Sequence, residues 1–279
     1  MTAPRLRPEI DSLPAYKAGQ MPAPRTDIET FKISSNETPF EPPEAVRRAI
    51  EQAAATVHRY PDPFSRRLTG ALARRFDVDE EQIALGTGSV AVVGQLIWAA
   101  AGPGDCVVYP WRSFEAYPIW VQMTGARSIQ VPLLADERHD LSSMLEAIDD
   151  STRIVFVCNP NNPTGEAVRR DELTEFIDAV PSDVIVVLDE AYREFISDTD
   201  VPDGLDFFHE RNNIVVMRTF SKAYGLAGLR VGFAIAPEPI AEGMRKTALP
   251  FGVSSIAEDA ALAALECEDE LFERVRHLS

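Results

Sequence analysis

One lysine stands where its side chain could do chemistry. Lys222 follows a β-branched stretch at residues 214–217, which predicts a buried strand with the amine just beyond its end. Burial opposes the charge of an ammonium group and lowers its pKa. A lysine that loses its proton readily can attack a carbonyl and form an imine. The position therefore indicates a reactive amine, with a solvated loop lysine as the alternative interpretation.

Groups that bind phosphate surround this lysine. Thr219 and Ser221 supply hydroxyls and Arg230 a guanidinium, the side chains that proteins use to hold a phosphate. A second phosphate signal is GTGS at 86–89, between a predicted strand and a predicted helix. Its glycines let backbone N–H groups face outward, and a helix N-terminus favours an anion. Together these residues predict a phosphorylated cofactor bound to Lys222.

A dinucleotide site is the rival interpretation of the glycine-rich segment. Gly86, Gly88 and Ala91 fit the pattern G-x-G-x-x-G/A. That pattern requires an acidic residue at the end of the next strand, to hold a ribose. The next predicted strand, residues 106–110, leads into Trp111 instead. Phosphate binding is therefore favoured over NAD.

A polar loop follows a third apolar strand. The segment CNPNNPTG at 158–165 is rich in Asn, Pro and Gly, which favours a rigid turn. Ligands of open α/β sheets bind beyond the carboxyl ends of the strands. Asn159 is the asparagine nearest the strand end, so its amide is expected to reach a ligand oxygen.

A carboxylate ends the next apolar strand. Asp189 follows VIVVL, and a carboxylate buried there needs a cationic partner. The partner is either an arginine, such as Arg193 or Arg230, or a protonated heterocyclic nitrogen of a ligand. Tyr192, three residues further on, could hydrogen-bond a phenolate oxygen of the same ligand.

Strands and helices alternate from residue 83 onward. Apolar runs predict strands at 83–85, 106–110, 126–133, 152–158, 183–192, 212–220 and 229–236. Helical spacing predicts helices at 44–57, 65–76, 90–100, 113–125, 141–148, 170–180 and 254–279. Such alternation with all-apolar strands indicates an α/β domain whose mostly parallel sheet is covered on both faces.

Composition limits the classes of partner. The chain has 279 residues and a net charge of −17, and no basic cluster offers a nucleic acid a binding face. Neither a signal peptide nor an apolar run of about 18 residues is present, so a cytoplasmic protein is expected. The three cysteines and four histidines are scattered, so no metal site is predicted.

The two ends of the chain differ in character. Residues 1–35 contain five prolines with little periodicity and are expected to form an extended arm. Residues 36–260 are expected to form the large domain. The helical tail stops without a cap or a following element, so we expect the chain to end inside a larger protein, with 261–279 beginning a second domain.

The motifs taken in order resemble a known family. GTGS, NPNNPTG, DEAY and TFSKAYGLAGLR, from about residue 30 to the end, resemble the fold-type I pyridoxal-phosphate aminotransferases of the histidinol-phosphate aminotransferase branch. WRSFEAYP at 111–118 is most similar to the actinobacterial aromatic (phenylalanine) aminotransferases. The resemblance implies a three-layer large domain that binds pyridoxal 5′-phosphate, and a small C-terminal domain largely absent from this chain.

The resemblance also implies a role for each predicted site residue. Lys222 would bind the cofactor covalently and later carry a proton to and from the substrate, and Asp189 would keep the pyridine nitrogen protonated. Tyr192 and Asn159 would hold the cofactor's O3′ oxygen. The phosphate would be bound by Gly88, Ser89, Thr219, Ser221 and Arg230, the ring would stack on Phe114, and Tyr60 would reach the phosphate of the other subunit in a homodimer.

Other functions compete with transamination. A decarboxylase of the phosphothreonine type would use the same Lys222 and Asp189. A regulator that senses pyridoxal phosphate needs a DNA-binding helix-turn-helix, which the arm of about 35 residues does not supply. A purely structural protein would not need four polar strand ends with matched chemistry.

Aromatic residues decide the expected substrate. The residues expected around the site are Trp111, Phe114, Tyr117, Tyr16 and Phe251. Histidinol phosphate is a dianion and needs extra cations in the site. The obvious candidate, Arg112, stands three residues before Glu115, which is expected to neutralise it. By family resemblance, residues 250–255 also lack the imidazole of histidinol-phosphate enzymes. We expect an aromatic amino acid, phenylalanine first, and a 2-oxo acid such as 2-oxoglutarate; histidinol phosphate is the alternative.

Overall fold

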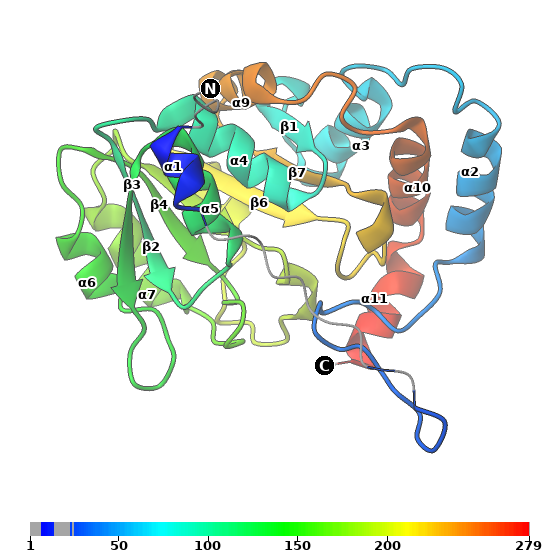
Figure 1. Ribbon diagram of the computed structural model, residues 1–279, viewed down its shortest axis with the longest axis horizontal. Helices are drawn as coiled ribbons and strands as arrows, with labels where there is room; N and C mark the ends of the chain where they lie inside the picture. The colour runs from blue at the N-terminus through cyan, green and yellow to red at the C-terminus, as the bar shows by residue number, and fades with distance from the viewer. Residues whose placement is uncertain (1–6, 14–22, 24, 279) are drawn as a thin grey trace, which may run out of the picture.

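One mixed sheet organises the chain. The computed structural model describes residues 7–13, 23 and 25–278, and within them seven strands form one sheet between helices (Figure 1). All seven lie where the sequence predicts strands, and the predicted three-layer α/β architecture is confirmed. The strands are β1 (Ile83–Gly86), β2 (Cys106–Trp111), β3 (Arg127–Pro132), β4 (Thr152–Cys158), β5 (Ile185–Asp189), β6 (Ile214–Thr219) and β7 (Gly232–Ile235).

The sheet brings three polar strand ends together. Its order is β1-β7-β6-β5-β4-β2-β3; neighbours from β6 to β3 run parallel, and β7 is antiparallel to β1 and β6. Asp189 at the end of β5 stands opposite Cys158 of β4 and Met217 of β6. The segments after β4, β5 and β6 therefore leave the sheet side by side, at the edge where open α/β sheets bind ligands.

Burial on both faces explains the apolar strands. Val186 and Leu188 of β5 belong to the core on one face of the sheet, whereas Val187 between them belongs to the core on the other. A strand covered on both sides has no solvent-facing positions, so its sequence is apolar throughout rather than alternating. This local signal is why the sequence predicts these strands well.

Helices cover the two faces unequally. The described helices are α1 (Pro8–Asp11), α2 (Glu44–Ala54), α3 (Arg66–Phe76), α4 (Ser89–Ala100), α5 (Ala116–Thr124), α6 (Leu141–Glu146), α7 (Arg170–Ala179), α8 (Gly204–Phe208), α9 (Glu238–Thr247), α10 (Ser255–Glu266) and α11 (Glu268–Arg276). Short 3-10 turns stand at Glu80–Gln82, Arg193–Phe195 and Ala227–Leu229. Side chains of α4, α5 and α9 pack on one face, and those of α3, α7, α8 and α10 pack on the other.

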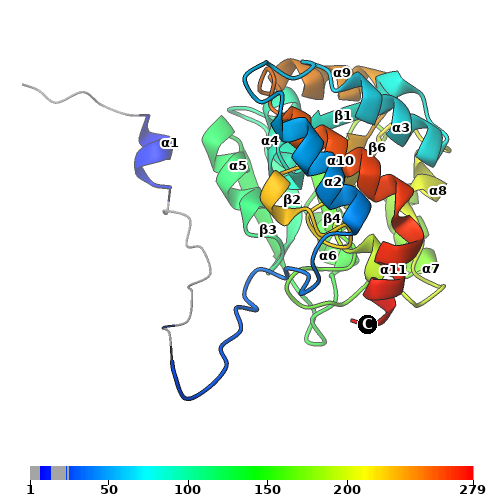
Figure 2. The same cartoon turned by 90° about the vertical axis from the view of Figure 1, so that its right-hand side faces the viewer.

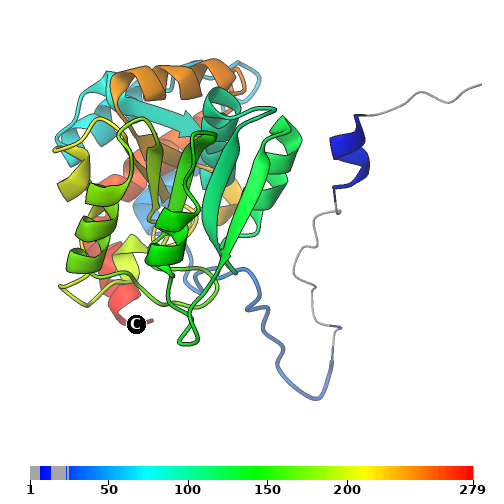
Figure 3. The same ribbon diagram turned by 90° about the vertical axis from the view of Figure 1, so that its left-hand side faces the viewer.

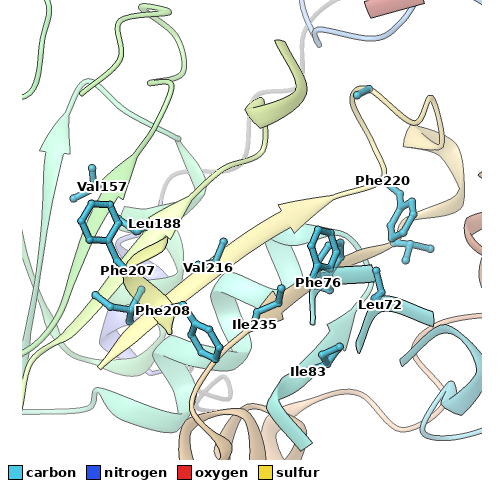
Figure 4. Close-up of a cluster of buried hydrophobic side chains, with 14 of the residues drawn as sticks. Leu72, Phe76, Ile83, Val157, Leu188, Phe207, Phe208, Val216, Phe220 and Ile235 are labelled. Carbon is cyan, nitrogen blue, oxygen red and sulfur yellow. The ribbon is translucent and has the colours of Figure 1, made fainter. Parts of the chain in front are cut away.

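The larger core lies on the second face. Figure 4 shows part of it, with Phe76 of α3, Phe207 of α8 and Val216 of β6 among the labelled side chains. Pro118 lies in the first turn of α5, where a helix has no internal partner for the backbone N–H that proline lacks. The predicted helix at 113–125 therefore forms despite its proline, starting three residues late.

The tail departs from the sequence prediction. Instead of one helix over 254–279, the chain bends at Cys267, whose φ and ψ of −107° and 16° are not helical. The bend turns α11 so that Leu271 and Val275 reach the main core. Figure 2 shows α10 beside α2, with α11 continuing beyond it. The division of the chain at residue 260 stays a prediction.

The sequence did not predict three of the described α-helices, which are α1, α8 and α9. Helix α9 (orange in Figure 3) starts after Pro237 and buries Ala241 and Met244 on the α4 side of the sheet. In the stretch expected to be an extended arm, α1 forms a single helical turn, and Arg7 before it donates a hydrogen bond to the carbonyl of Met123 at 2.9 Å.

Candidate active site

A cavity of about 460 Å³ lies at the strand ends. Segments after β2, β4, β5 and β6, the start of α4 and residues 34–36 contribute to its wall. Most of the predicted site residues meet there: Ser89, Phe114, Asp189, Tyr192, Thr219, Ser221, Lys222 and Arg230. Residues separated by more than a hundred positions in the sequence thus share one wall.

Lys222 reaches the N-terminal segment rather than an acid. Its Nζ donates hydrogen bonds to the carbonyls of Ser35 at 2.8 Å and Asn36 at 3.3 Å. Burial lowers the pKa of the ammonium group; the charge of Glu37 opposes this shift and that of Arg230 adds to it. The amine is therefore easier to deprotonate than a surface lysine, as the sequence predicts.

Asp189 is a buried carboxylate without a counter-ion among the described residues. Its Oδ2 accepts a hydrogen bond from Tyr117 Oη at 2.7 Å, whereas its Oδ1 is buried and has no partner there. Burial raises the pKa of the carboxyl. Neither suggested arginine neutralises it: Arg193 pairs with Asp203 at 3.3 Å, and Arg230 has other partners.

A tight arrangement holds Arg230 near the start of α4. Its Nη1 donates hydrogen bonds to Ser221 Oγ at 3.2 Å and to the carbonyl of Ala227 at 2.9 Å. Gly88 precedes α4 with a φ of +81°, and a Cβ there would collide with the guanidinium. Glycine therefore lets the arginine come against the helix start, where a cation and a helix N-terminus both favour an anion. Gly88 shapes the cavity without lining it.

Tyr192 lines the cavity beyond the end of β5 and, like Lys222, contacts the N-terminal segment. Its Oη accepts a hydrogen bond from Asn36 Nδ2 at 2.9 Å. Its ring also faces Lys222, whose Nζ lies 5.5 Å from the ring centroid. Asn36 therefore contacts both predicted functional groups, a role that the sequence did not indicate.

The structure contradicts the prediction for Asn159. Its Oδ1 accepts from the N–H of Val168 at 2.8 Å and its Nδ2 donates to the carbonyl of the same residue at 3.2 Å. The buried amide therefore bonds within its own loop through both its oxygen and its nitrogen, and Asn159 does not line the cavity. Asn162, three residues on, lines the cavity instead. The sequence signal was present in the three asparagines of NPNNPTG, but proximity to the strand selected the wrong one.

The predicted aromatic slot is only partly formed. Phe114 lines the cavity, whereas Tyr117 is fully buried and points its hydroxyl at Asp189. Phe251 instead packs against Tyr60, with ring centroids 4.8 Å apart, and Tyr60 is 84% exposed and does not line the cavity. Tyr16 lies outside the described residues.

An ion pair stands in the cavity wall. Arg112 Nη2 and Glu115 Oε1 lie 3.1 Å apart, as the spacing of three residues predicts. Arg112 also lies over the ring of Trp111. The extra cation that a dianionic substrate would need is thus already paired with an acid.

No helix among the described residues has both the length and the apolar character needed to cross a bilayer. Over the same residues, no three His, Cys, Asp or Glu side chains gather closely enough to share a metal ion.

Comparisons with known proteins agree with this geometry. Residues 28–278 match the family model for aminotransferase class I and II. The chain is 59% identical to an aromatic amino acid aminotransferase of Streptomyces coelicolor, over 99% of this chain and 77% of that protein. It is 55% identical to the protein of the same name from Thermobifida fusca, over 98% of this chain and 75% of that protein.

Solved structures give the same result. The histidinol-phosphate aminotransferase of Sinorhizobium meliloti, in complex with pyridoxal 5′-phosphate, superposes with a TM-score of 0.81 at 34% identity. The superposition covers 87% of this chain and 66% of that one. The cavity gathers a part-buried lysine, a buried aspartate and an arginine at a helix start. On the family match over residues 28–278 and the identity to curated relatives, the chain belongs to the class I and II aminotransferases.

Proposed function

We propose that this chain transfers the amino group of an aromatic amino acid to a 2-oxo acid, with pyridoxal 5′-phosphate as cofactor. The observation that carries the proposal is that three ionisable side chains of the cavity have no oppositely charged partner. Lys222, Arg230 and Asp189 share one cavity, yet none of them forms an ion pair within the described residues. A ligand that brings both a cation and an anion would satisfy all of them.

Pyridoxal 5′-phosphate fits these residues group by group. Its protonated ring nitrogen would give the unpartnered Oδ1 of Asp189 a donor. Its phosphate suits the helix start at Ser89 with Ser221, Thr219 and Arg230. Phe114 offers a ring face, and Asn162 and Tyr192 offer polar groups for the remaining ring oxygen. Asn162 takes the role that the sequence assigned to Asn159.

The chemistry divides between the cofactor and the chain. When bound, the cofactor supplies an electron-withdrawing ring that makes the substrate Cα–H acidic. Lys222 holds the cofactor and moves the proton at the substrate Cα, a task that its lowered pKa favours because the amine must be neutral to accept a proton. Asp189, as a carboxylate, keeps the proton on the ring nitrogen.

The substrate proposal rests on relatives and on the paired cation. The curated relatives described above are named aromatic amino acid aminotransferases. Phe114 gives the cavity an aromatic wall. The phosphate of histidinol phosphate would need a cation besides Arg230, and the one that the cavity wall offers, Arg112, is paired with Glu115. Histidinol phosphate remains the alternative substrate because the solved relative from Sinorhizobium meliloti is named a histidinol-phosphate aminotransferase.

A second copy of the chain would complete the site. Tyr60 is 84% exposed and its ring packs against that of Phe251, which is exposed as well. A groove of about 870 Å³, whose wall includes Pro250 and Gly252 on either side of Phe251, adds the exposed apolar side chains Phe64, Trp98 and Leu249. We infer that a homodimer covers this surface and that Tyr60 serves the partner's phosphate site, as the family resemblance implies.

Two measurements test the proposal. Adding pyridoxal 5′-phosphate to the purified protein should give visible absorbance that shifts when L-phenylalanine is added, with phenylpyruvate as the product. The ratio of kcat/KM for phenylalanine to that for histidinol phosphate then tests the substrate. We expect phenylalanine to be preferred by more than about tenfold, roughly 1.4 kcal/mol. A preference of that size for histidinol phosphate would reverse the assignment, and release of carbon dioxide would indicate a decarboxylase.

A further inference from the structure

The two oxygens of Asp189 have different surroundings. Tyr117 donates a hydrogen bond to Oδ2 at 2.7 Å, whereas Oδ1 has no partner among the described residues. The two residues are 72 positions apart in the sequence and belong to α5 and the end of β5. One oxygen is therefore held by the protein, and the other is left as the acceptor for a ligand.

Packing fixes the phenol that makes this bond. The ring of Tyr117 stacks on Phe156 of β4 with centroids 4.4 Å apart and an interplanar angle of 24°. The edges of Phe114 at 5.6 Å and Tyr109 at 5.7 Å contact it from other directions. A fully buried ring held on several sides cannot turn its hydroxyl away without opening the core.

The other groups near Asp189 do not neutralise it. Cys158 of β4 stays a neutral thiol, because burial raises its pKa to about 12. Tyr192, on the segment after β5, stays a neutral phenol because burial raises its pKa as well. The two cations of the cavity, Lys222 and Arg230, bond to carbonyl and hydroxyl groups elsewhere.

Tyr117 is thus the side chain that stabilises the charge of Asp189. Burial raises the pKa of the aspartate. The hydrogen bond from Tyr117 lowers it most, and the nearby backbone N–H of Ala191, which makes no hydrogen bond to Oδ1, lowers it less. The phenol stays a donor, because burial and the neighbouring carboxylate raise the pKa of Tyr117 well above its usual value.

We propose that Tyr117 is a positioning residue that keeps Asp189 in its carboxylate form and reserves Oδ1 for the cationic nitrogen of the cofactor. The identity of that nitrogen rests on the proposed function. The effect on the carboxyl group does not, because it operates in the cofactor-free protein.

The first test needs no cofactor. The protonation of Asp189 is followed against pH by infrared difference spectroscopy of the cofactor-free protein, with Asp189→Asn identifying its band. In Tyr117→Phe we expect the midpoint to rise by about one to two pH units, since a hydrogen bond to the charged form is lost. The matched control is Tyr109→Phe, which removes the hydroxyl of a buried neighbour that accepts from Gln130 Nε2 at 3.1 Å. Its midpoint should stay unchanged.

Packing and charge effects separate in this design. A purely structural role would lower the thermal stability of both variants without moving the midpoint. A shift of less than roughly 0.3 pH units in Tyr117→Phe, or an equal shift in both variants, overturns the proposal. If Tyr117→Phe does not fold, 3-fluorotyrosine at position 117 keeps the ring and strengthens the donor; the midpoint should then fall, and an unchanged midpoint overturns the proposal.

A second test uses the cofactor. Titration of cofactor-free protein with pyridoxal 5′-phosphate should show binding about tenfold weaker in Tyr117→Phe than in wild type or Tyr109→Phe. Equal affinity in all three proteins argues against the positioning role. If the wild-type protein binds no pyridoxal 5′-phosphate, the proposed function fails, while the infrared titration still decides the role of Tyr117.

Discussion

Replacing Asp189 by asparagine should affect stability and catalysis in opposite directions. Asparagine has nearly the same shape, and its amide oxygen can still accept the hydrogen bond that Tyr117 donates at 2.7 Å. The substitution removes a buried charge that has no counter-ion among the described residues. A buried charged group with an unmet partner costs about 1–3 kcal/mol or more. The cofactor-free variant should therefore be more stable by about that amount, several degrees in Tm.

The pH dependence gives this prediction its sign. Burial raises the pKa of Asp189 above that of an unfolded chain, so the native protein binds the extra proton between the two values. The stability that this group contributes is complete below the unfolded pKa of about 3.9 and is lost as pH rises through the native pKa. The advantage of Asp189→Asn should therefore grow as pH rises from about 4 toward neutrality and then level off.

Asp203→Asn is a control with the opposite sign. Burial is the largest influence on the pKa of Asp203 and raises it. The charge of Arg218 at 2.6 Å, the hydrogen bonds from Arg218 and from the backbone N–H of Leu205, and the charge of Arg193 together outweigh burial, so the pKa is lowered overall. Its stabilising contribution is present above the unfolded pKa and lost as pH falls through the native pKa. Asp203→Asn should thus destabilise the protein at neutral pH, with a penalty that shrinks in acid.

Catalysis should show the reverse effect for Asp189. With phenylalanine and pyridoxal 5′-phosphate, the half-reaction of Asp189→Asn should be slower by several orders of magnitude, because a preorganised charge is a large catalytic contribution. A rate within about tenfold of wild type, roughly 1.4 kcal/mol, would count against the catalytic role. Thermal unfolding at several pH values supplies the other readout. A cofactor-free variant that is less stable than wild type at neutral pH would refute the electrostatic reasoning.

Three further substitutions probe separate parts of the site. Lys222→Ala should lose the borohydride-reducible bond to the cofactor and nearly all turnover, measured by mass spectrometry and absorbance, while Lys246→Ala on the exposed face of α9 should keep both. Gly88→Ala should weaken cofactor binding by at least about tenfold, because the new Cβ displaces Arg230 and strains a φ of +81°; an unchanged Kd would show that the arginine does not hold the phosphate. Inactive Lys222→Ala mixed with a Tyr60→Phe variant should regain activity in hybrid dimers, and no recovery after proven subunit exchange would mean that each site is built from one chain.

The sheet could be predicted from the sequence because its signal is local. Strands such as β5 are buried on both faces, so each appears as an uninterrupted apolar run that ends at a polar residue. Since parallel strands present their carboxyl ends at one edge, the ends also located Lys222 and Asp189 near each other. Helix α9 gave a weaker signal, because only Ala241 and Met244 of its ten residues are buried.

The details of the site depend on contacts that are remote in sequence. Asn159 turns away from the cavity because its amide pairs with the backbone of Val168. The spacing of residues in the loop 158–165 does not predict this pairing. The aromatic residue Tyr117 looked like part of a substrate slot. Its hydroxyl belongs instead to Asp189, through a bond between α5 and β5.

The handling of charge separates the site from the rest of the interior. Buried Arg218 is neutralised within the fold, by Glu190 at 2.8 Å and Asp203 at 2.6 Å. In the cavity, by contrast, Asp189 and Lys222 bond to a phenol and to backbone carbonyls rather than to each other. Folding alone gains little from that arrangement, because unpaired charge near a protein interior is costly. The arrangement becomes favourable when a ligand supplies the missing charges. The ion pairs that do not form on folding then form on binding, and their free energy helps to bind and orient that ligand.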